Sequence, residues 1–203
     1  NDAITAVKKD AKVTTVGRGR DALRIFAIES GNPHVSAAAR RVGASLVIQK
    51  QPPDKVAENG HLQIFTDHRG EFDLRDVVRI LRIEEDLVQN RQRQARWEYL
   101  EQEGRQDDQH EWFYHKEGGW VFNGSRSSPE VPATTIPFDR IVHLVSLALG
   151  GRFEERREED CLTGHCDRRC PWYDIGLVRC RKVRFEQRQF QANADRPLPV
   201  RQR

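Results

Sequence analysis

Two segments of the chain carry apolar residues at the spacing of helices, and this constrains the fold more than any other feature. Over 74–88 the apolar residues recur every three or four positions, with Arg79, Arg82 and Glu85 on the opposite side of the predicted helix. Over 138–149 apolar residues occur almost all round, which predicts a substantially buried helix. Short apolar runs of strand length precede and separate the two segments, so the pattern predicts an α/β or α+β fold.

The strand predictions differ in how firmly the pattern supports them. Residues 45–50 and 61–67 have the composition of strands, and we expect the two to pair. The apolar run over 23–30 fits either a buried strand or a helix, and periodicity leaves both open. Residues 111–123 predict a β-hairpin. The expected body over residues 1–150 is thus a small mixed sheet packed by helices.

The predicted hairpin is rich in aromatic residues on both sides of its Gly118-Gly119 turn. One interpretation is that these rings pack beneath the hairpin and supply much of a core that is otherwise thin, since only 37% of the residues are hydrophobic. The other is a platform on which bases stack. We favour the core for these five residues: Trp112, Phe113, Tyr114, Trp120 and Phe122.

All four cysteines lie in the last quarter of the chain, in the spacing C-x4-C-x3-C-x9-C with one histidine inside it. The opening residues do not resemble a secretory signal, so we expect a cytoplasmic protein in which clustered thiols favour a metal over disulfides. Zinc with four thiolate or imidazole ligands is the leading interpretation, and an iron–sulfur cluster is the alternative because Cys170-Pro171 is typical of such sites. Disulfides or free thiols stay open. The candidate ligands are Cys161, His165, Cys166, Cys170 and Cys180.

His165 is either a ligand itself or a donor to one of the ligands. The cluster predicts a short Cys-rich module over 151–203, stabilised by the metal and separate from the body. No apolar run approaches the roughly 18 residues of a membrane span, so we expect no membrane partner.

Positive charge is concentrated in the same part of the chain. The 34 basic and 31 acidic residues give a net charge of +3, but residues 161–203 hold ten basic residues against four acidic ones. That segment carries +6 and the rest of the chain −3. We therefore expect it to bind nucleic acid or nucleotides through phosphate contacts, although a solvated charged terminus would look the same. The candidate contacts are Arg168, Arg169, Arg179, Arg181 and Arg184.

An enzyme is the rival interpretation. A phosphoesterase-like hydrolase would use His61, Asp67 and His68 near the edge of the sheet, but no nucleophile elbow, Walker loop or HExxH helix supports it. Residues 17–22 match the phosphate-loop pattern G-x-G-x-x-A, for which a plain glycine turn is the simpler explanation. No catalytic residue can be named from the sequence.

A third interpretation comes from residues 36–45, Ser-Ala-Ala-Ala-Arg-Arg-Val-Gly-Ala-Ser. They resemble the first helix and turn of a bacterial helix-turn-helix regulator, in which the following helix enters the major groove of DNA. The resemblance implies a recognition helix over 46–51, with the cysteines sensing metal or redox state. This segment is rich in β-formers and ends at Pro52-Pro53, so an ordinary strand–helix–strand unit competes with the resemblance. The regulator would be a dimer on a palindromic DNA site, and a monomer with a strand over 45–50 would exclude it.

Overall fold

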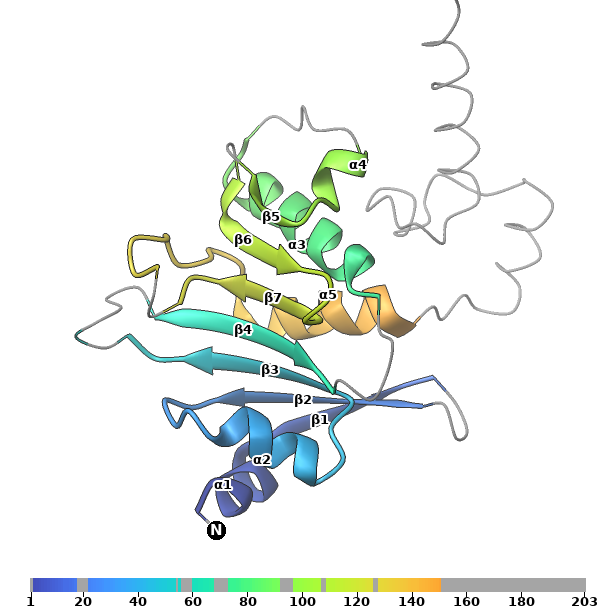
Figure 1. The fold of residues 1–203 in the computed structure, drawn as a ribbon, viewed down its shortest axis with the longest axis vertical. Coiled ribbons are helices and arrows are strands. Elements are labelled where there is room, and N and C mark those ends of the chain that lie inside the picture. The colour runs from blue at the N-terminus through green and yellow to red at the C-terminus, as the bar shows by residue number, and fades with distance from the viewer. Residues whose placement is uncertain are drawn as a thin grey trace, which may run out of the picture. The chain divides into compact units, whose positions relative to one another are not determined.

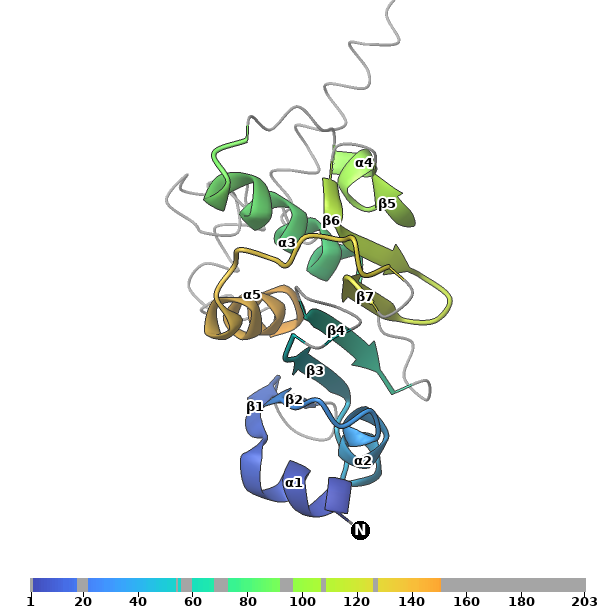
Figure 2. The ribbon, with the colours of Figure 1, turned by 90° about the vertical axis from the view of Figure 1, so that its left-hand side faces the viewer.

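The computed structural model describes residues 2–17, 22–53, 55, 60–67, 73–91, 97–106, 109–125 and 128–150. These residues form one seven-stranded mixed sheet with helices on both faces (Figures 1 and 2). The elements are α1 (Asp2–Asp10), β1 (Lys12–Val16), β2 (Leu23–Glu29), α2 (Val35–Arg41), β3 (Leu46–Gln51), β4 (His61–Thr66), α3 (Arg75–Val88), α4 (Trp97–Leu100), β5 (Gly104–Gln106), β6 (Gln109–His115), β7 (Trp120–Asn123) and α5 (Phe138–Gly150).

The strands lie in the order β1-β2-β3-β4-β7-β6-β5. β2 and β3 are parallel and are connected through α2, whereas the other neighbouring pairs are antiparallel. The predicted mixed sheet packed by helices is therefore confirmed, as are the pairing of β3 with β4 and the hairpin β6–β7. The predicted Cys-rich module over 151–203 lies outside the described residues.

The helices form two layers around the sheet. α3 and α5 pack on each other on one face, where α3 also contacts β6 and α5 contacts β1 (Figure 2). On the other face α1 and α2 pack over β2 and β3, in a core that contains Val7, Phe26, Val35 and Val47. Beyond β3, the described helices leave this second face of the sheet without cover (Figure 1).

Two sequence interpretations are wrong in the light of these elements. Residues Leu46–Gln51 form strand β3 between β2 and β4, so the recognition helix of a helix-turn-helix regulator does not exist here. The β-rich composition of this segment outweighs the helix-turn-helix resemblance of the residues before it. The segment with the phosphate-loop pattern lies between two antiparallel strands, β1 and β2, whereas a phosphate loop needs a helix after it. The run over 23–30 is accordingly a strand, β2.

Helix α3 departs from the expected amphipathic pattern. Its apolar side is buried as predicted, with Val77 and Leu81 fully covered. The polar side, however, is buried as well: Arg79, Arg82 and Glu85 are 3%, 0% and 1% exposed. The segment from α4 into β5 covers Arg79 and Arg82, while β6 and the segment after β7 cover Glu85, on what would otherwise be the solvent side of the helix. None of the helices in the described ranges is long and apolar enough to cross a membrane.

Candidate functional site

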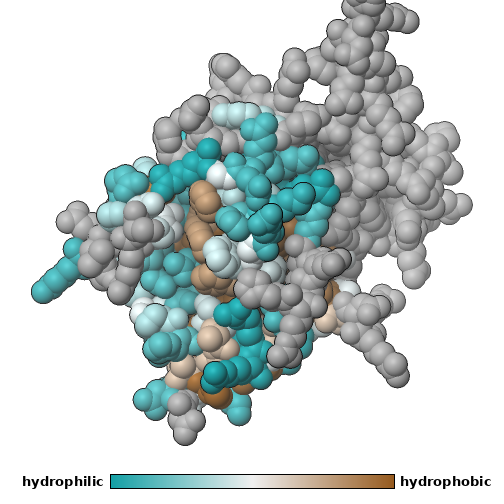
Figure 3. Space-filling view, viewed as in Figure 1, coloured by the Kyte–Doolittle hydropathy of each residue, from teal (hydrophilic) through white to brown (hydrophobic). Residues whose placement is uncertain are grey.

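On the face that α1 and α2 leave open, six side chains form a grid of two rows across three neighbouring strands. In order across β4, β7 and β6, the first row is Phe65, Trp120 and His115, and the second row is Gln63, Phe122 and Phe113. All six are partly exposed, whereas the residues that alternate with them are buried beneath α3 and α5. We call the five rings of this grid the aromatic platform. Figure 3 shows apolar side chains gathered over the middle of this face.

The platform begins at β4 because α2 covers the corresponding residues of β3. Val47, which pairs with Phe65, belongs to the core beneath α1 and α2. Gln49, which pairs with Gln63, is 1% exposed and accepts a hydrogen bond from Ser36 of α2 at 2.7 Å. The edge of helical cover therefore coincides with the boundary between β3 and β4.

Phe122 lies at the centre of the platform and contacts three other rings. Its ring centroid is 5.4 Å from that of Phe65 in an edge-on arrangement, and 5.9 Å and 6.4 Å from those of Trp120 and Phe113 in near-parallel arrangements. The ring of His115 stacks on Trp120 at 5.2 Å. Offset-stacked and edge-on pairs are the arrangements that aromatic rings prefer, so the neighbours hold one another in position.

The turn of the hairpin fits closely against two of these rings. A Cβ atom on Gly118 would lie 2.8 Å from Nδ1 of His115 and 2.9 Å from Cδ2 of Trp120, so a side chain there would displace them. The Gly118 N–H also donates to Nδ1 of His115 at 2.8 Å. Gly119 has a positive φ of 61°, and its carbonyl accepts hydrogen bonds from the N–H and the hydroxyl of Thr66. The glycine pair thus fixes the turn to both the platform and β4.

A cavity of about 530 Å³ adjoins the platform at the end of β7. Two phenylalanines, two serines and one arginine are among the described residues that line it. Its lining residues are Arg105, Phe113, Phe122, Gly124, Ser125 and Ser128. A terminal nitrogen of Arg105 lies 3.5 Å from Oε1 of Glu130 in a surface ion pair.

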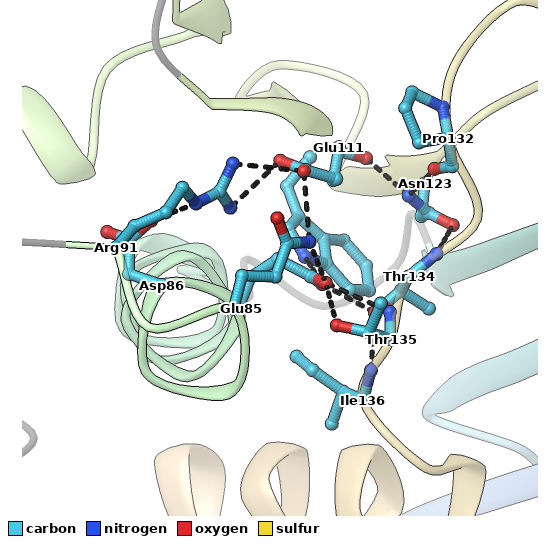
Figure 4. Close-up of polar contacts among 11 residues, drawn as sticks. Glu85, Asp86, Arg91, Glu111, Asn123, Pro132, Thr134, Thr135 and Ile136 are labelled. Atoms are coloured by element: carbon cyan, nitrogen blue, oxygen red, sulfur yellow. Dashed lines mark hydrogen bonds and ion pairs between the residues drawn. The ribbon is translucent and has the colours of Figure 1, made fainter.

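Beneath the platform, a buried polar network holds the hairpin to α3 (Figure 4). Both oxygens of Glu85 are engaged: one accepts from Gln89 and from the N–H and hydroxyl of Thr135, at 2.8–2.9 Å. The other accepts from the indole N–H of Trp112 at 3.0 Å and the hydroxyl of Thr134 at 2.5 Å. Burial by itself would raise the pKa of Glu85, but the hydrogen bonds from Thr134, Thr135 and Trp112 bring it below its ordinary value. This network is closed and structural.

A second part of the network fixes the hairpin strands themselves. Glu111 of β6 accepts from both terminal nitrogens of Arg91, at 3.0 and 3.2 Å, and Asp86 of α3 lies 3.0 Å from Nε of the same arginine. Asn123 of β7 donates to the carbonyl of Glu111 at 2.7 Å and accepts from the N–H of Thr134 at 2.8 Å. The strands that carry the platform are therefore anchored from behind.

The hairpin aromatics divide between the two interpretations offered by the sequence. Trp112 and Tyr114 are 0% and 2% exposed and belong to the core, and burial raises the pKa of Tyr114 to about 12. Phe113, Trp120 and Phe122 face the other side and are partly exposed. Sequence reasoning missed His115 and Phe65 as members of the platform. The period of two along β6 places His115 beside Phe113, but Phe65 joins only through strand register.

The other predicted site residues do not meet in the described part of the chain. His61 is the first residue of β4 and Asp67 follows its last, so an extended strand of roughly 20 Å separates them, and His68 lies outside the described residues. Among the described residues, His61 and Asp67 therefore do not come together as the hydrolase interpretation expects. Residues 151–203, with Cys161, His165, Cys166, Cys170, Cys180 and the five arginines named above, also lie outside the described residues. Within the described ranges, no three His, Cys, Asp or Glu side chains are grouped to hold a metal.

The chain matches no protein-family model and no curated protein sequence. The platform, the cavity beside it and the network beneath it therefore have to be interpreted from their own chemistry.

Proposed function

We propose that this protein binds single-stranded nucleic acid, with bases stacked on the aromatic platform. The observation that carries the proposal is the set of five partly exposed rings, arranged in two rows on a part of the sheet face that none of the described helices covers. Nucleic-acid bases stack on exposed aromatic side chains with about 1–3 kcal/mol per base, largely regardless of sequence. Bases inside a duplex present only their edges, so a stacking surface of this kind favours a single strand.

Polar groups beside the rings suit the edges of bases. Gln63 occupies one position of the grid, and its amide oxygen lies 3.4 Å from the amide nitrogen of Gln51. A side-chain amide carries both donors and acceptors, which matches the mixed pattern on the edge of a base. Gln63 pairs with Phe122 across the strands and lies two residues from Phe65 along β4, where a stacked base would bring its edge.

The arginines of the C-terminal segment are proposed to contact phosphates. The sequence supports this through the charge of +6 over residues 161–203 and the arginines within and after the cysteine cluster, namely Arg168, Arg169, Arg179, Arg181 and Arg184. A metal held by Cys161, His165, Cys166, Cys170 and Cys180 would order this segment. We propose zinc as that metal, with an iron–sulfur cluster as the alternative.

The proposal is tested by binding of a labelled single-stranded oligonucleotide of about 12 nucleotides, within the site sizes known for such surfaces. Phe122→Ala is expected to weaken binding about 5- to 150-fold, from the loss of one stacking partner. Phe122→Leu keeps an apolar side chain but removes the ring face, and it should weaken binding as well. Fluorescence anisotropy at several salt concentrations measures both the affinity and its salt dependence.

Phe138→Ala is the matched control. Phe138 is a partly exposed phenylalanine at the start of α5, where its ring contacts Lys50 rather than the platform. It should leave the affinity unchanged. Equal affinity of the Phe122→Ala variant and the unaltered protein would refute base stacking on the platform. An affinity that does not change with salt would refute the phosphate contacts.

A further inference from the structure

We propose that the cavity beside the platform is a site for a nucleoside monophosphate, either free or as the phosphorylated 5′ end of a strand. The inference rests on the proposed function, because one end of the bound nucleic-acid strand would lie in this cavity. Its volume of about 530 Å³ lies within the usual 300–1,000 Å³ of small-molecule sites. The chemistry of its walls selects the ligand.

The aromatic wall is shared with the platform. Phe113 and Phe122 line the cavity, and their rings are nearly parallel, at 10°, with centroids 6.4 Å apart. A planar base that stacks on this pair is therefore continuous with bases that stack on the rest of the platform. Phosphoserine and phosphothreonine would bring no ring to this wall, and phosphotyrosine would bring one small ring without the donors and acceptors on the edge of a base. We therefore infer a nucleotide rather than a phosphopeptide.

The cation in the wall suits a phosphate group. Arg105 lies in β5, where the pairing with β6 shifts register between Gly104 and Gln106. Such irregularities turn a side chain away from its regular direction, and here the arginine lines the cavity. A guanidinium group can hold two phosphate oxygens at once with its planar fork of donors.

Two hydroxyl groups lie in the same wall. Ser125 and Ser128 form an isolated bridge just after β7, and the Ser128 N–H donates to the Ser125 carbonyl at 3.0 Å. This hydrogen bond holds the two serines close together, and both line the cavity. Serine hydroxyls donate hydrogen bonds to phosphate oxygens, so they complement the arginine.

Glu130 is the competitor for the same guanidinium group. Its carboxylate oxygen is 3.5 Å from Arg105, which is longer than a strong charge-assisted hydrogen bond, and the two side chains are 68% and 32% exposed. Exposed ion pairs of this kind contribute little, whereas a phosphate carries a greater charge and more acceptor oxygens. We infer that phosphate replaces Glu130 as the partner of Arg105.

The experiment measures binding of AMP, adenosine and inorganic phosphate to the full-length protein by calorimetry. A second arm compares 5′-phosphorylated and 5′-hydroxyl oligonucleotides of one sequence. We expect AMP to bind about tenfold or more tightly than adenosine, because only AMP engages Arg105. Arg105→Gln should abolish this preference, and Glu130→Gln should strengthen AMP binding by roughly two- to fivefold. Arg140→Gln alters an exposed arginine of α5 that pairs with Glu84 of α3, and it should change neither the affinity for AMP nor the preference for AMP over adenosine.

The outcomes separate this inference from the proposed function. A preference for the 5′-phosphorylated strand supports a strand end as the ligand, and AMP binding without that preference supports a free nucleotide. Oligonucleotide binding that depends on Phe122, but shows no preference for AMP or for a 5′ phosphate, overturns the cavity site while the proposed function stands. AMP binding through Arg105 without any oligonucleotide binding overturns the proposed function, while the cavity site stands. A preference for AMP that survives in Arg105→Gln also overturns the site.

Discussion

At the scale of single residues, Glu85 connects more of the described structure than any side chain of the platform itself. Its two oxygens accept five hydrogen bonds, which come from α3, from β6 and from the segment that leads into α5. Removing the carboxylate would leave the buried indole N–H of Trp112 and the N–H of Thr135 without their acceptor. A buried donor that loses its partner costs about 1–3 kcal/mol.

We predict that Glu85→Ala lowers the free energy of unfolding by about 3–5 kcal/mol. Glu84→Ala is the matched control, since the neighbouring glutamate forms an ion pair with the exposed Arg140 and should cost less than about 1 kcal/mol. Urea unfolding followed by circular dichroism measures both. Similar losses in the two variants would contradict the role assigned to Glu85.

The same carboxylate gives the stability a pH dependence. Because the hydrogen bonds lower the pKa of Glu85 in the folded protein, its charged form stabilises the fold above the ordinary pKa of 4.5. This contribution is lost as the pH falls below 4.5 and through the folded value. Glu85→Gln should therefore lose less stability than the unaltered protein between pH 5 and acid pH, as unfolding curves in that range will show.

At the scale of elements, α3 is held to the sheet by an arginine that fastens several backbone segments at once. Arg82 is fully buried, and its terminal nitrogens donate to the carbonyls of Leu100, Gln102, Gly104 and Trp112 at 2.8–3.0 Å. These carbonyls belong to α4, the turn after it, β5 and β6. One side chain therefore joins the short elements at this edge of the sheet to the long helix.

We predict that Arg82→Lys destabilises the protein by about 2–4 kcal/mol, because an ammonium group on a thinner stem cannot reach four carbonyls in a planar fork. Arg140→Lys, on the surface of α5, should cost less than about 1 kcal/mol. Hydrogen exchange should also show faster exchange over 100–106 in the Arg82→Lys variant. Unchanged protection of that segment would show that other contacts hold β5 in place.

Elements with a local pattern were predictable from the sequence, and those defined by their neighbours were not. α5 and the hairpin β6–β7 follow from spacing and turn chemistry within a few residues. The run that became β2 was undecided, because a continuous apolar stretch fits a helix as well as a strand, and only pairing with β1 on one side and β3 on the other makes it a strand. The helix-turn-helix interpretation was wrong for the same reason, because pairing with β2 and β4 makes residues 46–51 a strand.

The site shows the same division. The cluster of hairpin aromatics was visible in the sequence, and the period of two along a strand predicts that Phe113 and His115 share a face. Which face stays open depends on where α2 ends over the sheet, and that is a tertiary property. The burial of Arg82 and Glu85 was likewise hidden, since their spacing along α3 is that of a solvent-facing side.

At the scale of the whole molecule, the chain combines a mildly acidic body with a basic C-terminal segment. If the platform supplies base stacking and the segment supplies phosphate contacts, the two contributions to affinity differ in their response to salt. Stacking is largely independent of salt, whereas each phosphate contact adds to the salt dependence. The two parts can then be separated in one titration.

We predict that the purified protein contains one zinc per chain and is colourless, and that removing the metal flattens the salt dependence of binding while the effect of Phe122→Ala persists. Cys170→Ser should act as metal removal does, and Thr163→Ala, within the cluster but without a metal-binding group, should not. Metal analysis with an absorption spectrum checks the first part. A brown protein with iron supports the iron–sulfur alternative, and a protein without metal contradicts both.

Two of the three strands that carry the platform, β4 and β7, are neighbours in the sheet but distant in the sequence. Phe65 belongs to β4 and Phe122 to β7, and the contact of Thr66 with Gly119 beside them joins residues 53 positions apart. Closing so long a loop is entropically costly, so this pairing should form late in folding, after the local hairpins. The surface that would hold a ligand therefore exists only once the chain has completed its sheet. A nucleic-acid strand bound across this junction would stabilise the native state, and the melting temperature would rise with the logarithm of its concentration once that exceeds the dissociation constant.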